Sequence, residues 1–136
     1  MKIESSFHHI GIACHDIRIT AKEYENFGYK SSKIIWDDIQ KVNICFLSGD
    51  GLPVIELISS DHEQNPIKKW LNKNGVSPYH LCFNVEDIEN SINEFKKQGF
   101  VLLGEAVEAI AIANRKIAFI YSMQSGLIEL VESEKI

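Results

Sequence analysis

The sequence lacks the features that mark several functional classes. It has no basic run and its net charge is −5, so neither duplex nucleic acid nor an anionic membrane is an expected partner. No apolar stretch approaches the roughly 18 residues of a membrane span. The N-terminal residues also lack the apolar core of a signal peptide. These absences predict a cytoplasmic protein.

Cysteine is scarce and odd in number. Cys14, Cys45 and Cys82 are the three cysteines, and each lies in an apolar run. No CxxC pair of the kind that binds structural zinc is present. We therefore predict three buried free thiols. The length of 136 residues suits one domain with a sizeable core, placed over residues 1–136.

The sequence does contain an internal repeat. FHHIGIACHDI returns as PYHLCFNVEDI after 71 residues, which aligns His9 with His80. VIELI returns as LIELV after 73 residues, which aligns Glu56 with Glu129. Copies that pair about a pseudo-twofold axis bring equivalent residues together. Two histidines and two glutamates facing one another would form a divalent-metal site.

Hydrophobic periodicity predicts the order β-α-β-β-β in both copies. Asp16 and Asp87 precede the amphipathic stretches as N-caps, and Gly28 and Gly99 close them. The expected strands lie at 7–14, 30–36, 41–48 and 53–59 in the first copy and at 79–85, 100–104, 115–122 and 126–132 in the second. The small apolar segment between the second and third strands of the second copy is ambiguous.

One helix cannot cover both faces of a four-stranded sheet, so each copy needs a partner. We expect an α+β fold in which two paired βαβββ modules form a curled mixed β-sheet cleft with helices outside. Pro66 opens a short helix between the copies. The single domain then divides into module one at about 7–60, a linker helix at about 65–74 and module two at about 78–132.

The four repeated polar residues all lie within expected strands, where alternate side chains line the cleft. A single strand histidine is more often a core residue, but a matched set of four favours a metal site. Nitrogen and oxygen donors without thiolate suit one divalent ion of Ni, Co, Zn, Mn or Fe. Four protein ligands leave two octahedral positions open, which is typical of catalysis. The predicted ligands are His9, Glu56, His80 and Glu129.

Such an ion can act as a Lewis acid on a substrate carbonyl and stabilise an enediolate. A ligating carboxylate that swings off the ion becomes a base for the proton α to that carbonyl. Glu129 and Glu56 are both eligible, and Glu129 is preferred. The expected partner is therefore a small carbonyl compound or thioester.

Three stretches carry a family resemblance: HIGIACHD, NPIKKWLNKNGVSPYHLCFNVEDI and NRKIAFIYSMQSGLIELVE. Over residues 7–132 the chain resembles the vicinal-oxygen-chelate superfamily, which includes glyoxalases, bleomycin resistance proteins and dioxygenases. The methylmalonyl-CoA epimerase family is most similar, and bacterial glyoxalase I is a near second. The resemblance implies paired βαβββ modules, a homodimer and the ligand order His, Gln or Glu, His, Glu. That order matches the four residues predicted above.

One position departs from the epimerase pattern. Those enzymes resemble this chain but carry a second acidic residue that faces the metal, and the alignment puts Asn43 there. An amide cannot accept a proton at neutral pH, so a two-base epimerisation would lose a partner. Glyoxalase-type isomerisation of a methylglyoxal hemithioacetal, the lactoylglutathione lyase reaction, therefore stays open.

The repeat aligns Asn43 with Lys116, which follows Arg115. All three are predicted substrate contacts, with solvated positions at a strand edge as the alternative for the two cations. Two further functions compete. An extradiol-type dioxygenase uses two histidines and one carboxylate around Fe²⁺, and Glu56 would fill a position that oxygen needs. A non-catalytic binding protein of the resistance type usually lacks the metal ligands.

Overall fold

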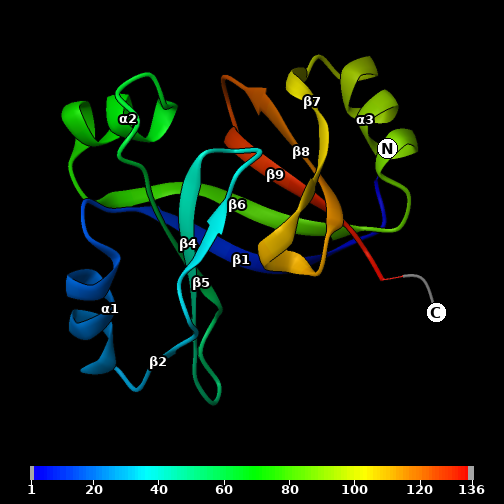
Figure 1. The fold of residues 1–136 in the computed structure, drawn as a ribbon. Helices are drawn as coiled ribbons and strands as arrows, with labels where there is room; N and C mark the ends of the chain where they lie inside the picture. Colours follow the sequence, from blue (N-terminus) through cyan, green and yellow to red (C-terminus); the bar gives the residue numbers. More distant parts are fainter. Residues whose placement is uncertain (1, 135–136) are drawn as a thin grey trace. The chain divides into compact units, whose positions relative to one another are not determined.

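The computed structural model describes residues 2–134. These residues form two compact units. The first unit comprises residues 9–79, and the second comprises residues 2–8 together with 80–134. Figure 1 shows the elements of both units in sequence colours. The β-α-β-β-β order predicted from the repeat is present twice.

The first unit holds a mixed sheet with strand order β2-β4-β5-β1. β1 runs parallel to β5, whereas β4 runs antiparallel to β5, β2 and β3. The residues of β1 before His9 belong to the second unit. The elements are β1 (Ser5–Ala13), α1 (Ile17–Glu25), β2 (Lys30–Ser31), β3 (Ile35–Asp37), β4 (Val42–Ser48), β5 (Ile55–Ser59) and α2 (Pro66–Asn74).

The second unit holds a mixed sheet with strand order β6-β9-β8-β7. β6 runs parallel to β9, and the other pairs are antiparallel. The N-terminal segment packs here, since Phe7 meets Phe83 edge-on with ring centroids 5.6 Å apart. The elements are β6 (Ser77–Val85, whose residues before His80 belong to the first unit), α3 (Ile88–Lys97), β7 (Val101–Ala109), a 3₁₀ turn (Ile110–Ile112), β8 (Arg115–Ser122) and β9 (Gly126–Glu132). The predicted α+β class with two βαβββ modules is confirmed.

The predicted helix ends are also confirmed. Asp16 Oδ1 accepts the backbone N–H groups of Arg18 and Ile19 at 2.9 and 3.4 Å, which satisfies donors at the start of α1. Asp87 Oδ1 caps α3 in the same way. Gly28 and Gly99 follow the two helices with φ of 94° and 95°, a left-handed conformation that glycine adopts without strain.

The strand expected at 30–36 is instead two short strands. β2 and β3 both pair with β4, but their registers differ by one residue. Ser32 lies at the break, where its Oγ accepts the backbone N–H of Phe46 at 2.9 Å. The Ser32 hydroxyl thus takes the place of a backbone hydrogen-bond acceptor, and the pairing register with β4 shifts at this point.

β7 extends into the segment that the sequence left ambiguous, and the 3₁₀ turn follows it there. The pairing of β7 with β8 shifts register between Leu103 and Val107, and Gly104 has a φ of 75°. An irregularity of this kind inserts extra residues into one strand and breaks the alternation of side chains. Because the alternation is interrupted, the hydrophobic periodicity did not predict this part of the strand.

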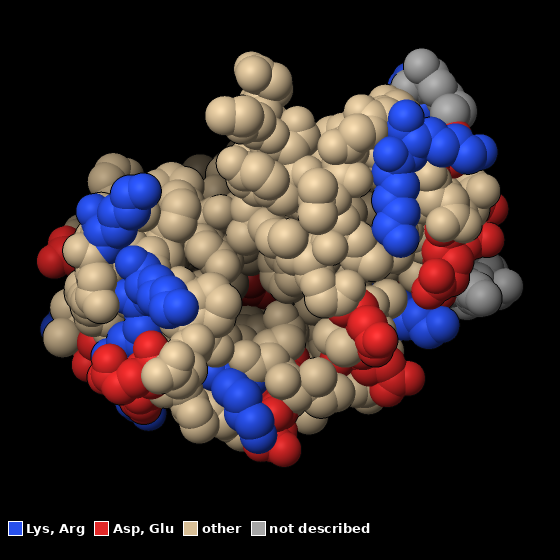
Figure 2. Space-filling model, turned by 90° about the horizontal axis from the view of Figure 1, so that it is seen from above, with Lys and Arg blue, Asp and Glu red and all other residues tan. Residues whose placement is uncertain are grey.

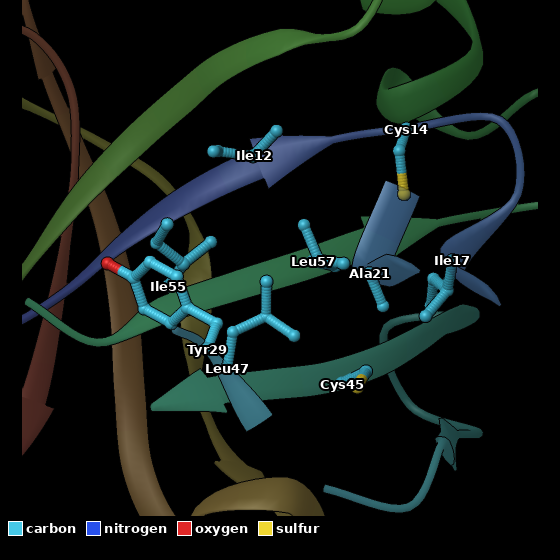
Figure 3. Packing of buried hydrophobic residues seen from close by; sticks show 9 residues of the cluster. All are labelled: Ile12, Cys14, Ile17, Ala21, Tyr29, Cys45, Leu47, Ile55 and Leu57. Carbon is cyan, nitrogen blue, oxygen red and sulfur yellow. The ribbon is translucent and has the colours of Figure 1, made fainter. Parts of the chain in front are cut away.

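One face of each sheet is covered by the helix of its own unit. In the first unit α1 packs on β4 and β5 over nine buried side chains, which include Cys14, Cys45 and Leu47 (Figure 3). In the second unit α3 packs on β7, β8 and β9 over a cluster that includes Ala118 and Ile120. We call the opposite face of each sheet its site face.

The predicted burial is confirmed for all three cysteines. Burial raises the pKa of the Cys14 thiol to about 11, and burial also raises the pKa of Cys45. Both thiols are therefore protonated at neutral pH and act as small apolar groups in the α1 core.

Within residues 2–134, no helix is long and apolar enough to cross a membrane. On the face drawn in Figure 2, Lys and Arg side chains stand beside Asp and Glu side chains. The expected cytoplasmic location stays a prediction.

Candidate metal centre

The first half-site lies on the site face of the first unit. β1 and β5 pair with Gly11 opposite Glu56, so His9 and Glu56 project from the same face. The distance between His9 Nε2 and Glu56 Oε1 is 3.5 Å. Both side chains are buried, and Glu56 is only 2 % exposed.

The second half-site repeats this arrangement in the second unit. β6 and β9 pair with Cys82 opposite Glu129, which puts His80 and Glu129 on one face. His80 Nε2 lies 3.1 Å from Glu129 Oε1, and Glu129 is again 2 % exposed. The predicted ligands therefore lie as two His–Glu pairs, one in each unit. The joining of both pairs around one ion stays a prediction.

Each pair fits two adjacent ligand positions of a divalent ion. Nitrogen and oxygen ligands bind such ions at about 2.0–2.2 Å, so two ligands at a right angle lie about 3 Å apart. The two His–Glu distances of 3.5 and 3.1 Å are close to that value. A buried carboxylate also needs a compensating charge or donor, which a metal ion would supply. The donors and their spacing fit the group.

A phenylalanine accompanies each half-site, and sequence reasoning missed both. Phe46 lies opposite Glu56 in the β4–β5 register, and Phe119 lies opposite Glu129 in the β8–β9 register. Phe46 meets the His9 ring edge-on with centroids 5.5 Å apart, and Phe119 meets His80 at the same distance. The offset of 73 residues that aligns the glutamates also aligns these rings, so the signal was in the sequence.

Asn43 does not face its half-site, contrary to the prediction. It pairs with Ser59 and alternates with Ile44 and Phe46, so it shares the α1 face with Cys45. A shift of one residue along a strand exchanges the two faces. Ile44 and Phe46, which flank Cys45 in β4, lie on the site face.

Lys116 also lies on the helix face, in keeping with the solvated alternative, and its contact with substrate stays a prediction. It pairs with Glu108 and alternates with Ile117, which follows Phe119 on the site face. Its exposed side chain lines a surface hollow with Asp87 and Glu132 near the start of α3.

Arg115 lies on the site face at the first residue of β8, where it ties three strands together. Its Nε donates to the carbonyl of Glu132 and its Nη2 donates to Asn84 Oδ1, both at 2.6 Å. Asn84 Nδ2 donates in turn to Ser6 Oγ at 3.2 Å. The guanidinium is thus engaged in holding β8 to its neighbours, and its contact with substrate stays a prediction.

Comparison with known proteins identifies the family. Residues 8–119 match the model of the Glyoxalase/Bleomycin resistance protein/Dioxygenase superfamily. This chain belongs to that superfamily. The resemblance predicted from the three sequence stretches is confirmed.

Several relatives are epimerases. The chain is 28 % identical to an ethylmalonyl-CoA/methylmalonyl-CoA epimerase of Cereibacter sphaeroides, over 83 % of this chain and 85 % of that protein. A crystal structure of methylmalonyl-CoA epimerase from Mycobacterium tuberculosis matches with a TM-score of 0.83 at 28 % identity, over 95 % of this chain and 88 % of the other. A variant of the Streptomyces coelicolor enzyme, in complex with 2-nitronate-propionyl-CoA, matches with a TM-score of 0.81 at 26 % identity, over 95 % and 97 %.

Proposed function

We propose that this chain is a divalent-metal-dependent isomerase that moves the proton α to a thioester carbonyl, as a methylmalonyl-CoA epimerase does. The observation that carries the proposal is the pair of buried His–Glu half-sites, at equivalent positions of two equivalent units. The epimerase relatives support the reaction type and the acyl-CoA substrate class.

In this proposal both half-sites hold one ion. His9, Glu56, His80 and Glu129 each offer one ligand atom. The ion would polarise the substrate carbonyl as a Lewis acid and so acidify the adjacent C–H bond. The donor set suits Ni, Co, Zn, Mn or Fe. The homodimer expected from the resemblance stays a prediction.

The chain's own carboxylates carry the proton. Glu129 takes the proton from the α-carbon and returns it, and its burial beside Phe119 limits the access of water. β4 and β8, the strands next to the two glutamate strands, contain no Asp or Glu. Glu56 is therefore the carboxylate available as a second proton carrier.

The test follows the α-proton directly. Purified protein, loaded with each candidate ion, is incubated with methylmalonyl-CoA in D₂O, and deuterium at the α-carbon is measured by mass spectrometry. Glu129→Gln should slow incorporation by about 10²–10⁴-fold, because the amide cannot accept the proton. Glu108→Gln, on an exposed residue of β7, is the matched control. Wild-type protein that binds no divalent ion and incorporates no deuterium would refute the proposal.

A specific observation favours a second candidate, glyoxalase I chemistry. The site face of β4 presents Ile44 and Phe46, so the second acid that the epimerase resemblance predicts is absent from this strand. Isomerisation of a hemithioacetal needs one carboxylate to carry the proton between adjacent carbons. Turnover of methylglyoxal with glutathione, without deuterium exchange into methylmalonyl-CoA, would select this candidate.

A further inference from the structure

A surface hollow lies between α1 and the segment that joins β2 to β3, on the helix face of the first unit. Its volume is about 380 Å³, which is within the range of small-molecule pockets. The buried side chains of Ile17, Ala21 and Cys45 line it, together with the half-buried Ile34. The first three belong to the cluster drawn in Figure 3. We call this feature the α1 hollow.

The polar groups at the floor of the α1 hollow already have partners. Ser32 Oγ accepts the backbone N–H of Phe46 at 2.9 Å, and Cys45 Sγ donates to the carbonyl of Ser32 at 3.2 Å. Burial also raises the pKa of the Cys45 thiol, which therefore stays protonated at neutral pH. The floor thus offers an apolar surface of a kind that suits an alkyl chain.

The rim of the hollow carries two cations and one acid. Arg18 and Lys33 are exposed, and neither forms an ion pair within residues 2–134. Glu25 follows Arg18 by seven residues, which is about 10 Å along the helix axis. A guanidinium presents a fork of N–H donors that matches a carboxylate. The charges therefore favour one carboxylate at Arg18 and disfavour a second one near Glu25.

We infer that the α1 hollow binds a small monocarboxylate with an alkyl chain. The carboxylate lies at Arg18 and Lys33, and the chain packs on Ile17, Ala21 and Ile34. The hollow is separate from the first half-site, because Cys45 points to the helix face of the sheet whereas Glu56 projects from the site face. The inference goes beyond the proposed function and does not depend on it.

A titration with hexanoate tests the site. Amide chemical shifts of the ¹⁵N-labelled protein should change and saturate in residues 17–25 and 31–34, which border the hollow. Octanoate should bind about tenfold more tightly, because each buried methylene favours binding by about fourfold. Adipate has the chain length of hexanoate and a second carboxylate, so it should bind more weakly than hexanoate. Hexylamine should cause no saturable shift in these residues, since the cations of the rim repel it.

Exposed charges allow variants that leave the core intact. Arg18→Ala should weaken hexanoate binding by about tenfold and Lys33→Ala by about threefold, since each removes a charged hydrogen-bond donor at the surface. Lys30→Ala is the matched control, because Lys30 is an exposed cation of β2 that does not line the hollow. Its affinity for hexanoate should stay within about twofold of wild type.

The contrary results are clear. Adipate that binds as tightly as hexanoate, or a loss in Lys30→Ala equal to that in Arg18→Ala, would mean general attraction of anions to the surface and would overturn the inference. Absence of saturable shifts around the hollow would overturn it as well. Neither result bears on proton exchange at the metal centre, and failure of that exchange leaves the α1 hollow unaffected.

Discussion

The two units repeat each other on their site faces and diverge on their helix faces. His9, Phe46 and Glu56 have counterparts of identical type in the second unit, with the same strand pairing and with the same centroid distance between the rings. On the helix faces, Cys45 corresponds to Ala118, and each core fits a different helix. Each helix face packs only against its own helix, whereas matched site faces are what the proposed sharing of one ion would require.

Removal of one histidine from either unit should have the largest effect on metal binding. If both half-sites hold one ion, His9→Ala and His80→Ala should each weaken Co²⁺ binding by at least about 100-fold, because each removes a direct ligand. His15→Ala, an exposed turn histidine, is the control. Calorimetric titration of the metal-free protein measures the effect. A large loss in one histidine variant with none in the other would mean that the units do not contribute equally.

Alkaline pH should lower the stability of the fold through the helix-face core that contains Cys14, and not through the core beneath α3. In the unfolded chain the Cys14 thiol ionises at its ordinary pKa of 9.0, but in the fold burial raises the pKa to about 11. Between these values the unfolded state binds fewer protons, so stability falls as pH rises from about 9 to about 11. The shifted pKa of Cys14 alone should lower the free energy of unfolding by about 2–3 kcal/mol across that window, at 1.36 kcal/mol per pKa unit.

Urea denaturation at several pH values measures this loss. The α3 cluster contains no cysteine. Cys14→Ala should therefore flatten the alkaline fall in stability, although it lowers stability at neutral pH through lost packing. An alkaline fall of unchanged size in Cys14→Ala would contradict the assignment to this thiol.

Substitution of Phe46 or Phe119 should give the smallest of these effects. Because each ring contacts the imidazole of its own half-site, Phe46→Leu and Phe119→Leu should each weaken Co²⁺ binding by about tenfold, as groups that orient metal ligands do. The Co²⁺ absorption spectrum should change in both variants, which loss of packing alone would not cause. A spectrum identical to that of wild type, with reduced thermal stability, would make the rings simple core residues.

The sequence predicted the half-sites because the repeat aligned whole strands. Each His–Glu pair depends only on a parallel pairing inside one module, and the aspartate caps and glycine ends located the helices between the strands. The phenylalanines were aligned by the same offset but have no ionisable group, so chemistry alone did not single them out.

The predictions that failed depended on single-residue register. Asn43 was placed on the correct strand but on the wrong face, because one step along a strand reverses the side chain. The break at Ser32 and the register shift after Leu103 depend on local hydrogen bonds that periodicity does not encode. The asymmetric residues thus belong to the helix faces, and the site faces are more alike than the sequence indicated.

The stoichiometry of metal binding tests the central claim most directly. Metal-free protein titrated with Co²⁺ should bind one ion per chain, since two His–Glu pairs are proposed to share it. Two ions per chain, one for each half-site, or no binding above background would contradict the account.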